Sequence, residues 1–269
     1  MIAFASNSLL CRAALKQTAI DPASFTFVRI LSGAVALFFI SSLATRRSSL
    51  RNGNWISAVA LFAYAAAFSF AYVDLSAGTG ALLLFGAVQV TMILWGFRKG
   101  ERLDALQILG MLIALIGLVV LVFPGLSAPP LIGSIFMIAA GIAWGVYSLH
   151  GKSATDAVAA TAGNFLRAVP FAIVVSMIAF SRIHFDSLGA IYALISGAIT
   201  SGLGYVIWYS ALRDLKATSA ATVQLSVPVL AATGGILLLG ESVNLRYVIA
   251  SVAVLGGIAL AILERQRQS

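Results

Sequence analysis

The chain has 269 residues, of which 61% are hydrophobic and only 10% are charged, and its mean hydropathy is +1.02. A soluble domain is typically about 45–50% apolar and about 25% charged, so this composition excludes a soluble enzyme, a nucleic-acid-binding protein and a disordered chain. The formal net charge of +8 is therefore interpreted as the Lys and Arg excess that orients a membrane protein, with no nucleic-acid partner.

Ten apolar runs follow one another along the chain, and a membrane-spanning helix needs roughly 20 such residues. The predicted helices cover residues 1–15, 23–44, 55–72, 77–97, 106–123, 131–149, 157–180, 188–212, 217–239 and 246–263. Turn-forming pairs such as Asp21-Pro22, Pro124-Gly125 and Pro129-Pro130 separate neighbouring runs. The predicted fold class is an all-α integral membrane protein of ten transmembrane helices, with the lipid bilayer as its surroundings.

The distribution of Lys and Arg predicts the orientation. With the N-terminus inside, eleven of these residues fall in cytoplasmic segments, and three, Lys16, Arg182 and Arg246, fall outside. Cytoplasmic loops carry the positive excess, so both termini are predicted to be cytoplasmic, in the inner (plasma) membrane.

The two halves of the chain resemble each other at a shift of about 140 residues. Asp74-Leu75 matches Asp214-Leu215, and Gly100-Glu101 matches Gly240-Glu241; at a shift of 138, Arg29 matches Arg167. We expect a first repeat over residues 1–125 and a second over 126–269. Each holds five spans, an odd number, so the halves lie inverted, as in many secondary transporters. The same shift indicates that the first helix is roughly seven residues shorter than its counterpart.

Several stretches carry a family resemblance. Pro22, Phe25 and Arg29 form a Pro-x-x-Phe-x-x-x-Arg start to the second helix; the stretches 76–90, 100–122 and 216–243 follow the same family pattern. The chain resembles the EamA-type ten-helix members of the drug/metabolite transporter superfamily. The resemblance implies export of small metabolites, such as amino acids or their derivatives, through a central cavity among helices 1, 3, 4, 6, 8 and 9.

The two repeats differ where the resemblance places the cavity. Gln89 stands at the end of Ala87-Val88-Gln89, where the second repeat has Val227-Pro228-Val229. Asn7 follows Ser6, where the second repeat has Trp144-Gly145. These differences leave the substrate undetermined.

Arginines within apolar runs are candidate site residues because each is costly in a membrane. Arg12, Arg29 and Arg167 are the three. They could bind an anion or carboxylate, or anchor helix ends to carbonyls and headgroups. The symmetric placement of Arg29 and Arg167 favours the structural or gating role for both, whereas Arg12 is assigned to the substrate pathway.

Buried amides and mid-span aromatic residues are further candidates. Asn7, Gln89, Asn164 and Gln224 should face protein or a wet cavity, as pathway residues or as interhelical hydrogen-bond partners. The predicted substrate pathway also holds Tyr64, Trp144, Tyr147, Tyr205, Trp208 and Pro228. Tyr72, Tyr209 and Trp95 lie near helix ends and are expected in the interfacial aromatic belt.

All nine acidic residues fall in loops or at helix ends, and Glu101 and Glu241 mark turns with a structural or gating role. The absence of a mid-span carboxylate argues against proton coupling through a buried acid and favours a carrier of neutral or anionic metabolites. No catalytic motif or phosphate-binding glycine loop is found, so neither enzyme activity nor a cofactor is expected. Cys11 is the only cysteine, which excludes an internal disulfide and a cysteine metal cluster.

Small residues recur on the fifth and tenth helices, among them Gly110, Gly117, Ala253 and Gly257. They permit close helix contact, within the chain or in a homodimer. The favoured function is a secondary transporter of small organic metabolites that works by alternating access. The alternatives are a multidrug efflux transporter and a non-transporting membrane scaffold.

Overall fold

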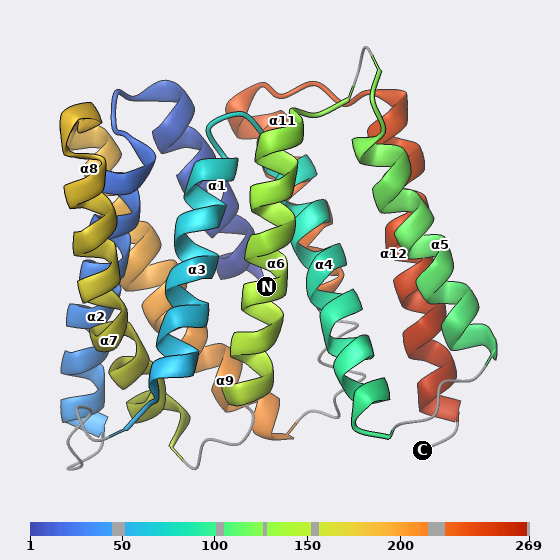
Figure 1. Ribbon diagram of the computed structural model, residues 1–269, viewed down its shortest axis with the longest axis horizontal. Helices are drawn as coiled ribbons and strands as arrows, with labels where there is room; N and C mark the ends of the chain where they lie inside the picture. Colours follow the sequence, from blue (N-terminus) through green and yellow to red (C-terminus); the bar gives the residue numbers. More distant parts are fainter. Residues whose placement is uncertain (45–51, 101–104, 126–127, 152–155, 215–223, 268–269) are drawn as a thin grey trace.

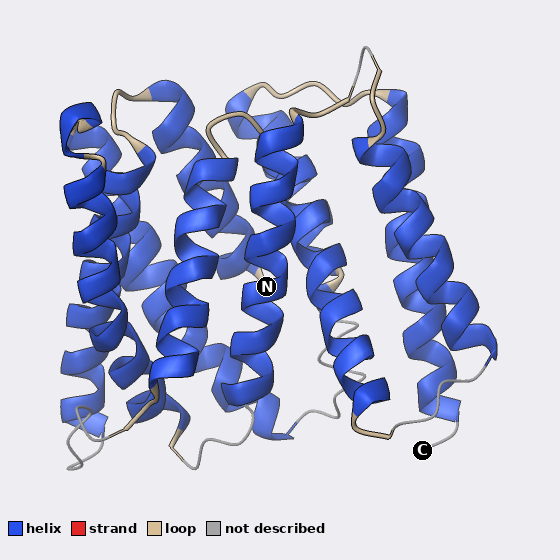
Figure 2. Cartoon of the chain, viewed as in Figure 1, coloured by secondary structure: helices blue, strands red, loops and turns tan. Residues whose placement is uncertain are grey.

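The computed structural model describes residues 1–44, 52–100, 105–125, 128–151, 156–214 and 224–267. Throughout this described part the secondary structure is helical, without a β-strand (Figure 2). The helices are α1 (Ile2–Gln17), α2 (Pro22–Ala44), α3 (Trp55–Ala71), α4 (Ala77–Arg98), α5 (Ala105–Val122), α6 (Leu131–Gly151), α7 (Ala157–Ile178), η2 (Phe180–Arg182), α8 (Ser187–Ile195), η3 (Ser196–Leu203), α9 (Gly204–Asp214), α11 (Ser226–Leu239) and α12 (Leu245–Arg267).

These bounds agree within four residues with eight of the ten predicted helices. The predicted helix 188–212 is interrupted: α8, η3 and α9 follow one another without a loop, and η3 is a π-helix. The predicted helix 217–239 begins in residues that lie outside the described part, and α11 forms its remainder.

Polar side chains fix several helix starts. Asn54, Ser76, Asp156 and Asp186 each accept a hydrogen bond from a backbone N–H in the first turn of α3, α4, α7 and α8, respectively. Such caps satisfy N–H groups that have no partner within the helix. The residues that separate the apolar runs therefore also define where the helices begin.

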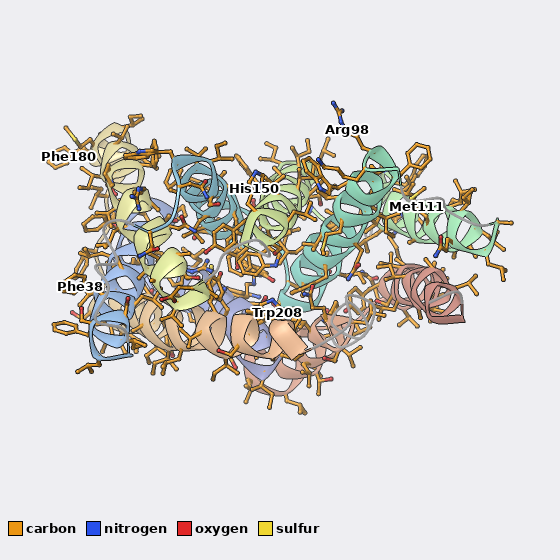
Figure 3. All side chains as sticks on the ribbon, turned by 90° about the horizontal axis from the view of Figure 1, so that it is seen from below. Phe38, Arg98, Met111, His150, Phe180 and Trp208 are labelled. Carbon is orange, nitrogen blue, oxygen red and sulfur yellow. The ribbon has the colours of Figure 1, made fainter. Side chains whose placement is uncertain are left out.

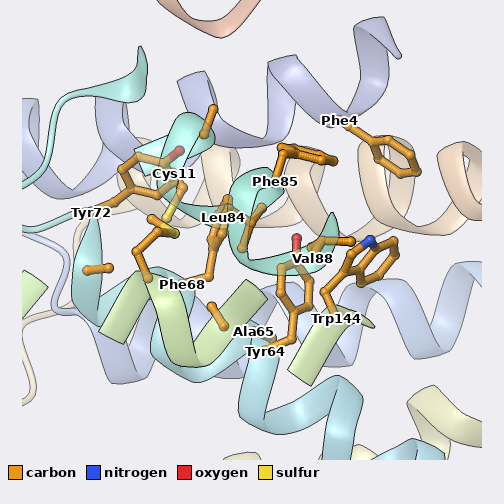
Figure 4. Packing of buried hydrophobic residues seen from close by; sticks show 14 of the residues in the cluster. Phe4, Cys11, Tyr64, Ala65, Phe68, Tyr72, Leu84, Phe85, Val88 and Trp144 are labelled. Atoms are coloured by element: carbon orange, nitrogen blue, oxygen red, sulfur yellow. The ribbon is translucent and has the colours of Figure 1, made fainter. Parts of the chain in front are cut away.

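The helices form two rows, seen end-on in Figure 3. In one row α7, α3, α6 and α4 pack side by side; in the other, α2, η3, α1 and α11 do so. Contacts between α2 and α7 and between α4 and α11 join the rows. The large buried core lies between them, and Figure 4 shows its central part, where Phe4, Tyr64, Phe68 and Trp144 meet.

The outside of the bundle is apolar. Leu43, Ile207 and Val252 are 89%, 67% and 70% exposed, and many other large aliphatic and aromatic side chains face outward. Six helices of the described part are long and apolar enough to cross a membrane, and α3, α11 and α12 contain shorter apolar stretches. Exposed apolar side chains on this scale need lipid around them.

The turns at residues 72–76 and 240–244 lie at one end of the bundle, here called the upper face because it is uppermost in Figure 1. The turn at residues 52–54 lies at the opposite, lower face. The helix α1 has 16 residues, against 21 in α6. Its first residues lie near mid-height, where Figure 1 marks the N-terminus.

The pair α5 and α12 stands at one end of the rows (Figure 1). A Cβ atom on Gly257 would collide with the carbonyl oxygen of Gly110 and the amide nitrogen of Ala114, and one on Gly117 would meet Ala253. The small residues thus bring two backbones of the same chain into contact, as small residues do in membrane helix pairs.

Because of this packing, the adjacent residues Gly256 and Gly257 differ in how well they tolerate a larger side chain. We expect Gly257→Val to separate α5 from α12 and lower the midpoint of thermal unfolding in detergent, because the added methyl groups overlap backbone atoms. Gly256→Val is the matched control, since a Cβ there meets no atom within 4 Å. Size-exclusion chromatography combined with a thermal scan measures both. Equal midpoints for the two variants would contradict this packing.

Candidate functional site

A buried polar network lies between the two rows, and Asn7 of α1 is at its centre. The Nδ2 of Asn7 donates to the hydroxyl oxygen of Tyr64 at 3.2 Å. Its Oδ1 accepts from the Ser196 hydroxyl at 2.5 Å and from the Thr200 hydroxyl at 3.3 Å. Asn7 is only 3% exposed, so this short side chain links α1 to α3 and η3 inside the protein.

Arg29 of α2 extends the network. Its Nη2 donates to the Tyr64 hydroxyl at 3.0 Å and to the Ser201 hydroxyl at 3.3 Å, and its Nε lies 3.4 Å from the same Ser201 oxygen. The guanidinium also lies over the rings of Tyr64 and Phe68, 5.1 and 4.9 Å from their centroids. Arg29 is 2% exposed, so it turns into the bundle and does not reach the lipid headgroups.

The π-helix η3 presents the three hydroxyls. A π-helix bonds i to i+5, and it places Ser196, Thr200 and Ser201 on the side that faces α1 and α2. Gly197 allows this approach, because a Cβ on it would overlap the carbonyl oxygen of Arg29 and the hydroxyl of Ser32. A π-turn within a long helix is frequent at functional sites.

An aromatic cluster adjoins the network. Trp144 has ring centroids 4.9 Å from both Tyr64 and Tyr205, and 5.8 Å from Phe4. Tyr147 lies beside Trp144 at 5.6 Å, and Trp208 lies beside Phe4 at 5.8 Å. The rings leave one small cavity of about 10 Å³, lined by Phe4, Tyr64, Phe68, Leu84, Phe85 and Trp144. In this state the centre is filled by side chains, with space for about one water molecule.

Arg12 and Glu241 close the upper face above this centre. Arg12 Nε lies 3.2 Å from Glu241 Oε1, and both side chains are 8% exposed. Arg12 Nη1 also donates to the carbonyl oxygens of Tyr72 and Val73, at 3.0 and 2.8 Å. Glu241 Oε2 accepts from the amide of Ala77 at 2.8 Å, at the positive end of α4. The ion pair and these hydrogen bonds together join α1, the turn before α4 and the turn before α12.

A surface cavity of about 260 Å³ lies beside this ion pair. Its lining includes Asp74, Thr79, Glu241, Asn244 and Tyr247. Below it, Tyr72 is fully buried and its hydroxyl donates to the carbonyl oxygen of Ala77. Tyr72 was expected in the interfacial belt; that expectation is wrong, because the turn after α3 folds the ring inward onto Phe68 and α4.

Arg167 occupies a different environment from Arg29, although the two match in the repeat that the sequence predicts. Arg167 Nη1 donates to the carbonyl oxygens of Asn52 and Gly163 at 2.6 and 3.0 Å. Its neighbour Asn164 accepts from the amide of Asn54 at 2.9 Å. Both residues therefore hold the lower turn at 52–54 against α7.

The comparison with known proteins identifies the family. The sequence profile of the EamA-like transporter family matches residues 1–123 and 131–263. The chain belongs to the EamA-like transporter family. It is a membrane transporter by its family, and its apolar helices and outward-facing apolar side chains indicate a multi-pass membrane protein.

Two relatives of this EamA-like transporter match nearly all of its length, and a third matches about two thirds of it. An uncharacterised protein of Pseudomonas aeruginosa is 56% identical over 98% of this chain and 92% of its own. An uncharacterised transporter of Archaeoglobus fulgidus is 25% identical over 97% and 93%. A probable amino-acid metabolite efflux pump of Salmonella typhimurium is 27% identical over 68% and 66%. A crystal structure with 19% identity covers 99% of this chain and 96% of its own at a TM-score of 0.70, which shows a shared fold.

The predicted site residues of the EamA-like transporter fall into three groups. Asn7, Tyr64, Trp144, Tyr147, Tyr205 and Trp208 meet at the centre, whereas Arg12 pairs with Glu241 above it. Gln89, Gln224 and Pro228 are buried; Gln89 Nε2 and Gln224 Oε1 have no hydrogen-bond partner within the described part of the chain. Glu101 lies outside the described residues.

Sequence reasoning missed Phe4, Ser196, Thr200 and Ser201. The last three are hydroxyl residues in an otherwise apolar span, beside Gly197 and Gly202, and that grouping was the available signal. It was overlooked because a serine or threonine can satisfy its own hydroxyl by bonding a carbonyl one turn earlier, as Thr200 also does to Ser196. Only the π-turn shows that they converge on Asn7 and Arg29.

Proposed function

We propose that this transporter moves small organic metabolites, amino acids or related compounds, across the cell inner membrane by alternating access. The observation that carries the proposal is the buried network of Arg29, Asn7 and hydroxyls at the centre, closed from the upper face by Arg12 and Glu241. An ionisable side chain buried within a membrane span is costly and is a functional-site candidate by default, which makes Arg29 the first candidate for a solute path. The name of the Salmonella relative supports the substrate class.

The architecture behind the proposal is ten spans in two inverted halves, residues 1–125 and 126–269. Two separate matches to one family profile support a repeat. The span 187–214 counts as one helix with a π-turn, and α11 is the described part of the ninth span. The Lys and Arg distribution supports a cytoplasmic orientation of the lower face and of both termini.

The proposed transport cycle is a rocking of the two halves. In the described state the upper ion pair is formed and the aromatic rings fill the centre. Rocking one half against the other would separate Arg12 on α1 from Glu241 before α12, and open the centre upward. The surface cavity beside Glu241 then joins the path. No covalent step occurs; the side chains bind, release and exclude water.

Counterflow in proteoliposomes tests this function. Vesicles loaded with unlabelled amino acids should accumulate a labelled amino acid from outside, saturably and only when the inside is loaded. A carrier that exposes one site alternately gives this exchange, whereas a channel-like module or scaffold does not. Absence of trans-stimulated exchange with any amino acid tested would contradict the proposal.

One observation favours the multidrug alternative. An apolar cavity of about 760 Å³ lies between α4, α5 and α6, lined by residues such as Val90, Leu94, Trp95 and Leu118. It would suit a hydrophobic solute, but Arg98 also lines it and would repel a cation. Transport of a hydrophobic cationic dye in the same vesicles distinguishes the two functions. Dye movement without amino-acid exchange would contradict metabolite transport and favour multidrug efflux.

A further inference from the structure

Arg29 carries a positive charge that no described side chain in contact with it neutralises. An arginine guanidinium stays protonated in proteins, and burying such a charge without a counter-ion is costly. Its hydrogen-bond partners, Tyr64 and Ser201, are neutral hydroxyls. Among the described residues the one ion pair joins Arg12 to Glu241, so it does not involve Arg29. The centre of the bundle therefore has a net positive charge.

The guanidinium is also incompletely hydrogen-bonded. Its Nη1 is buried and has no hydrogen-bond partner within the described part of the protein. An Nη1 carries two N–H groups, and carboxylates are the acceptors that match them best. The hydroxyl of Tyr64 accepts from both Arg29 and Asn7. The Nη1 of Arg29 is therefore the group at the centre that a carboxylate oxygen would satisfy.

Apolar rings surround the guanidinium. Arg29 lies over Phe68 and Tyr64, and both rings also line the small central cavity together with Phe4 and Trp144. These four rings come from α1, α3 and α6, and all four are labelled in Figure 4. A solute that enters when the centre opens would place an acidic group at Arg29 and an apolar body among the rings.

We propose that Arg29 is the binding residue for the carboxylate of the transported solute, and that the solute class is small organic acids with an apolar or aromatic body. This inference rests on the proposed transport function and names its substrate class. Within the described part of the centre there is no acidic side chain that could pair with an ammonium group. The site therefore selects for the acid and does not require an amine.

Ligand-induced stabilisation of the purified full chain tests the inference without a transport step. Two series vary the acid and the amine separately on one body: phenylalanine, 3-phenylpropionate, phenylalaninamide and phenethylamine, and the matching four compounds with a leucine side chain. We expect the two acids of at least one series to raise the midpoint of thermal unfolding, and the amide and amine to leave it unchanged.

Two variants locate the effect. Arg29→Gln should remove the acid-dependent shift, and Arg29→Lys should weaken acid binding roughly tenfold to a hundredfold, because the hydrogen bonds to a charged acceptor are lost while the charge remains. Arg167→Gln is the matched control: Arg167 binds backbone carbonyls at the lower turn, so the variant should keep the acid-dependent shift.

The outcomes separate this inference from the transport proposal. Equal stabilisation of the wild-type protein by acid, amide and amine would overturn the inference. No stabilisation of the wild-type protein by either series would overturn it too. Neither result depends on a variant that folds. An acid-dependent shift that survives Arg29→Gln would overturn it as well. If the acids bind as expected but no amino acid is exchanged in vesicles, carboxylate recognition stands and the transport proposal fails.

Discussion

Glu241→Gln and Arg12→Gln are each expected to open the upper face. Removing one partner of a buried ion pair leaves the other charge uncompensated and costs about 3–5 kcal/mol at full burial. Both side chains are 8% exposed, so a large part of that cost applies. In the proposed cycle this cost falls on the state in which the upper face is closed, because rocking of the halves separates α1 from the turn before α12.

Cys11 provides the readout. It is the only cysteine of the chain, it is fully buried, and it precedes Arg12 on α1 (Figure 4). In the closed state a membrane-impermeant maleimide should label it very slowly from the upper side. In either variant the labelling rate should rise, since a more open upper face exposes the thiol more often. The wild-type sequence needs no removal of other cysteines for this experiment.

A double variant and a control make the result specific. In the double variant Arg12→Gln/Glu241→Gln, Cys11 should be labelled more slowly than the two single effects would predict if they were additive. The double variant leaves no unpaired charge at the upper face. Asp186→Asn is the control: Asp186 is another upper-face carboxylate, but it caps α8 and does not contact Arg12. Wild-type labelling rates in both single variants would show that the ion pair does not hold the upper face closed.

Tyr64→Phe is expected to reduce exchange by roughly one to two orders of magnitude, with little effect on membrane insertion. The change removes one oxygen that accepts from Arg29 and from Asn7, and it leaves Asn7 Nδ2 without that acceptor inside the protein. An unsatisfied buried polar group costs about 1–3 kcal/mol, more for a charged one. The phenyl ring keeps the contacts with Phe68 and Trp144, so packing is preserved.

The initial rate of counterflow at equal protein density measures this effect. Tyr192→Phe on α8 serves as the control, because it makes the same chemical change on a partly exposed ring that packs at the edge of the core. It should leave the rate unchanged. Equal exchange rates for Tyr64→Phe and the wild type would remove the Tyr64 hydroxyl from the substrate path.

Most of the helical pattern could be predicted from the sequence, because continuous apolar runs between turn residues have few other structures available in a membrane. Eight predicted helices match the structure within four residues. The π-turn in η3 could not be predicted, because it depends on how α1 and α2 pack against it and not on local composition. Its hydroxyls therefore stayed out of the predicted site.

The two matched arginines show a second limit. The predicted repeat gives equivalent positions to Arg29 and Arg167, which lie about two turns into α2 and nearly three turns into α7, respectively. Their contacts differ because residues from other helices decide them: Tyr64 and Ser201 meet Arg29, whereas backbone carbonyls at 52 and 163 meet Arg167. Sequence symmetry sets the backbone position, and tertiary neighbours set the chemistry.

The aromatic candidates show what the sequence can do well. Tyr64, Trp144 and Tyr147 were selected because they lie mid-span, and all three belong to one buried cluster. Tyr72 was assigned to the interface from its position near a helix end, and only the inward turn at 72–76 shows that its ring is buried. Depth along a helix is readable from sequence, whereas the direction of a terminal side chain is not.

The labelling rate of Cys11 in the wild-type protein, with and without an exchanged solute, tests the central claim of alternating access most directly. Vesicles with the upper face outside are loaded with the amino acid that gives the strongest counterflow, and maleimide is added outside. Alternating access predicts that solute on the lower side raises the labelling rate several-fold, because carriers return to the upper-open state. An unchanged rate with a solute that the protein demonstrably exchanges would contradict the account.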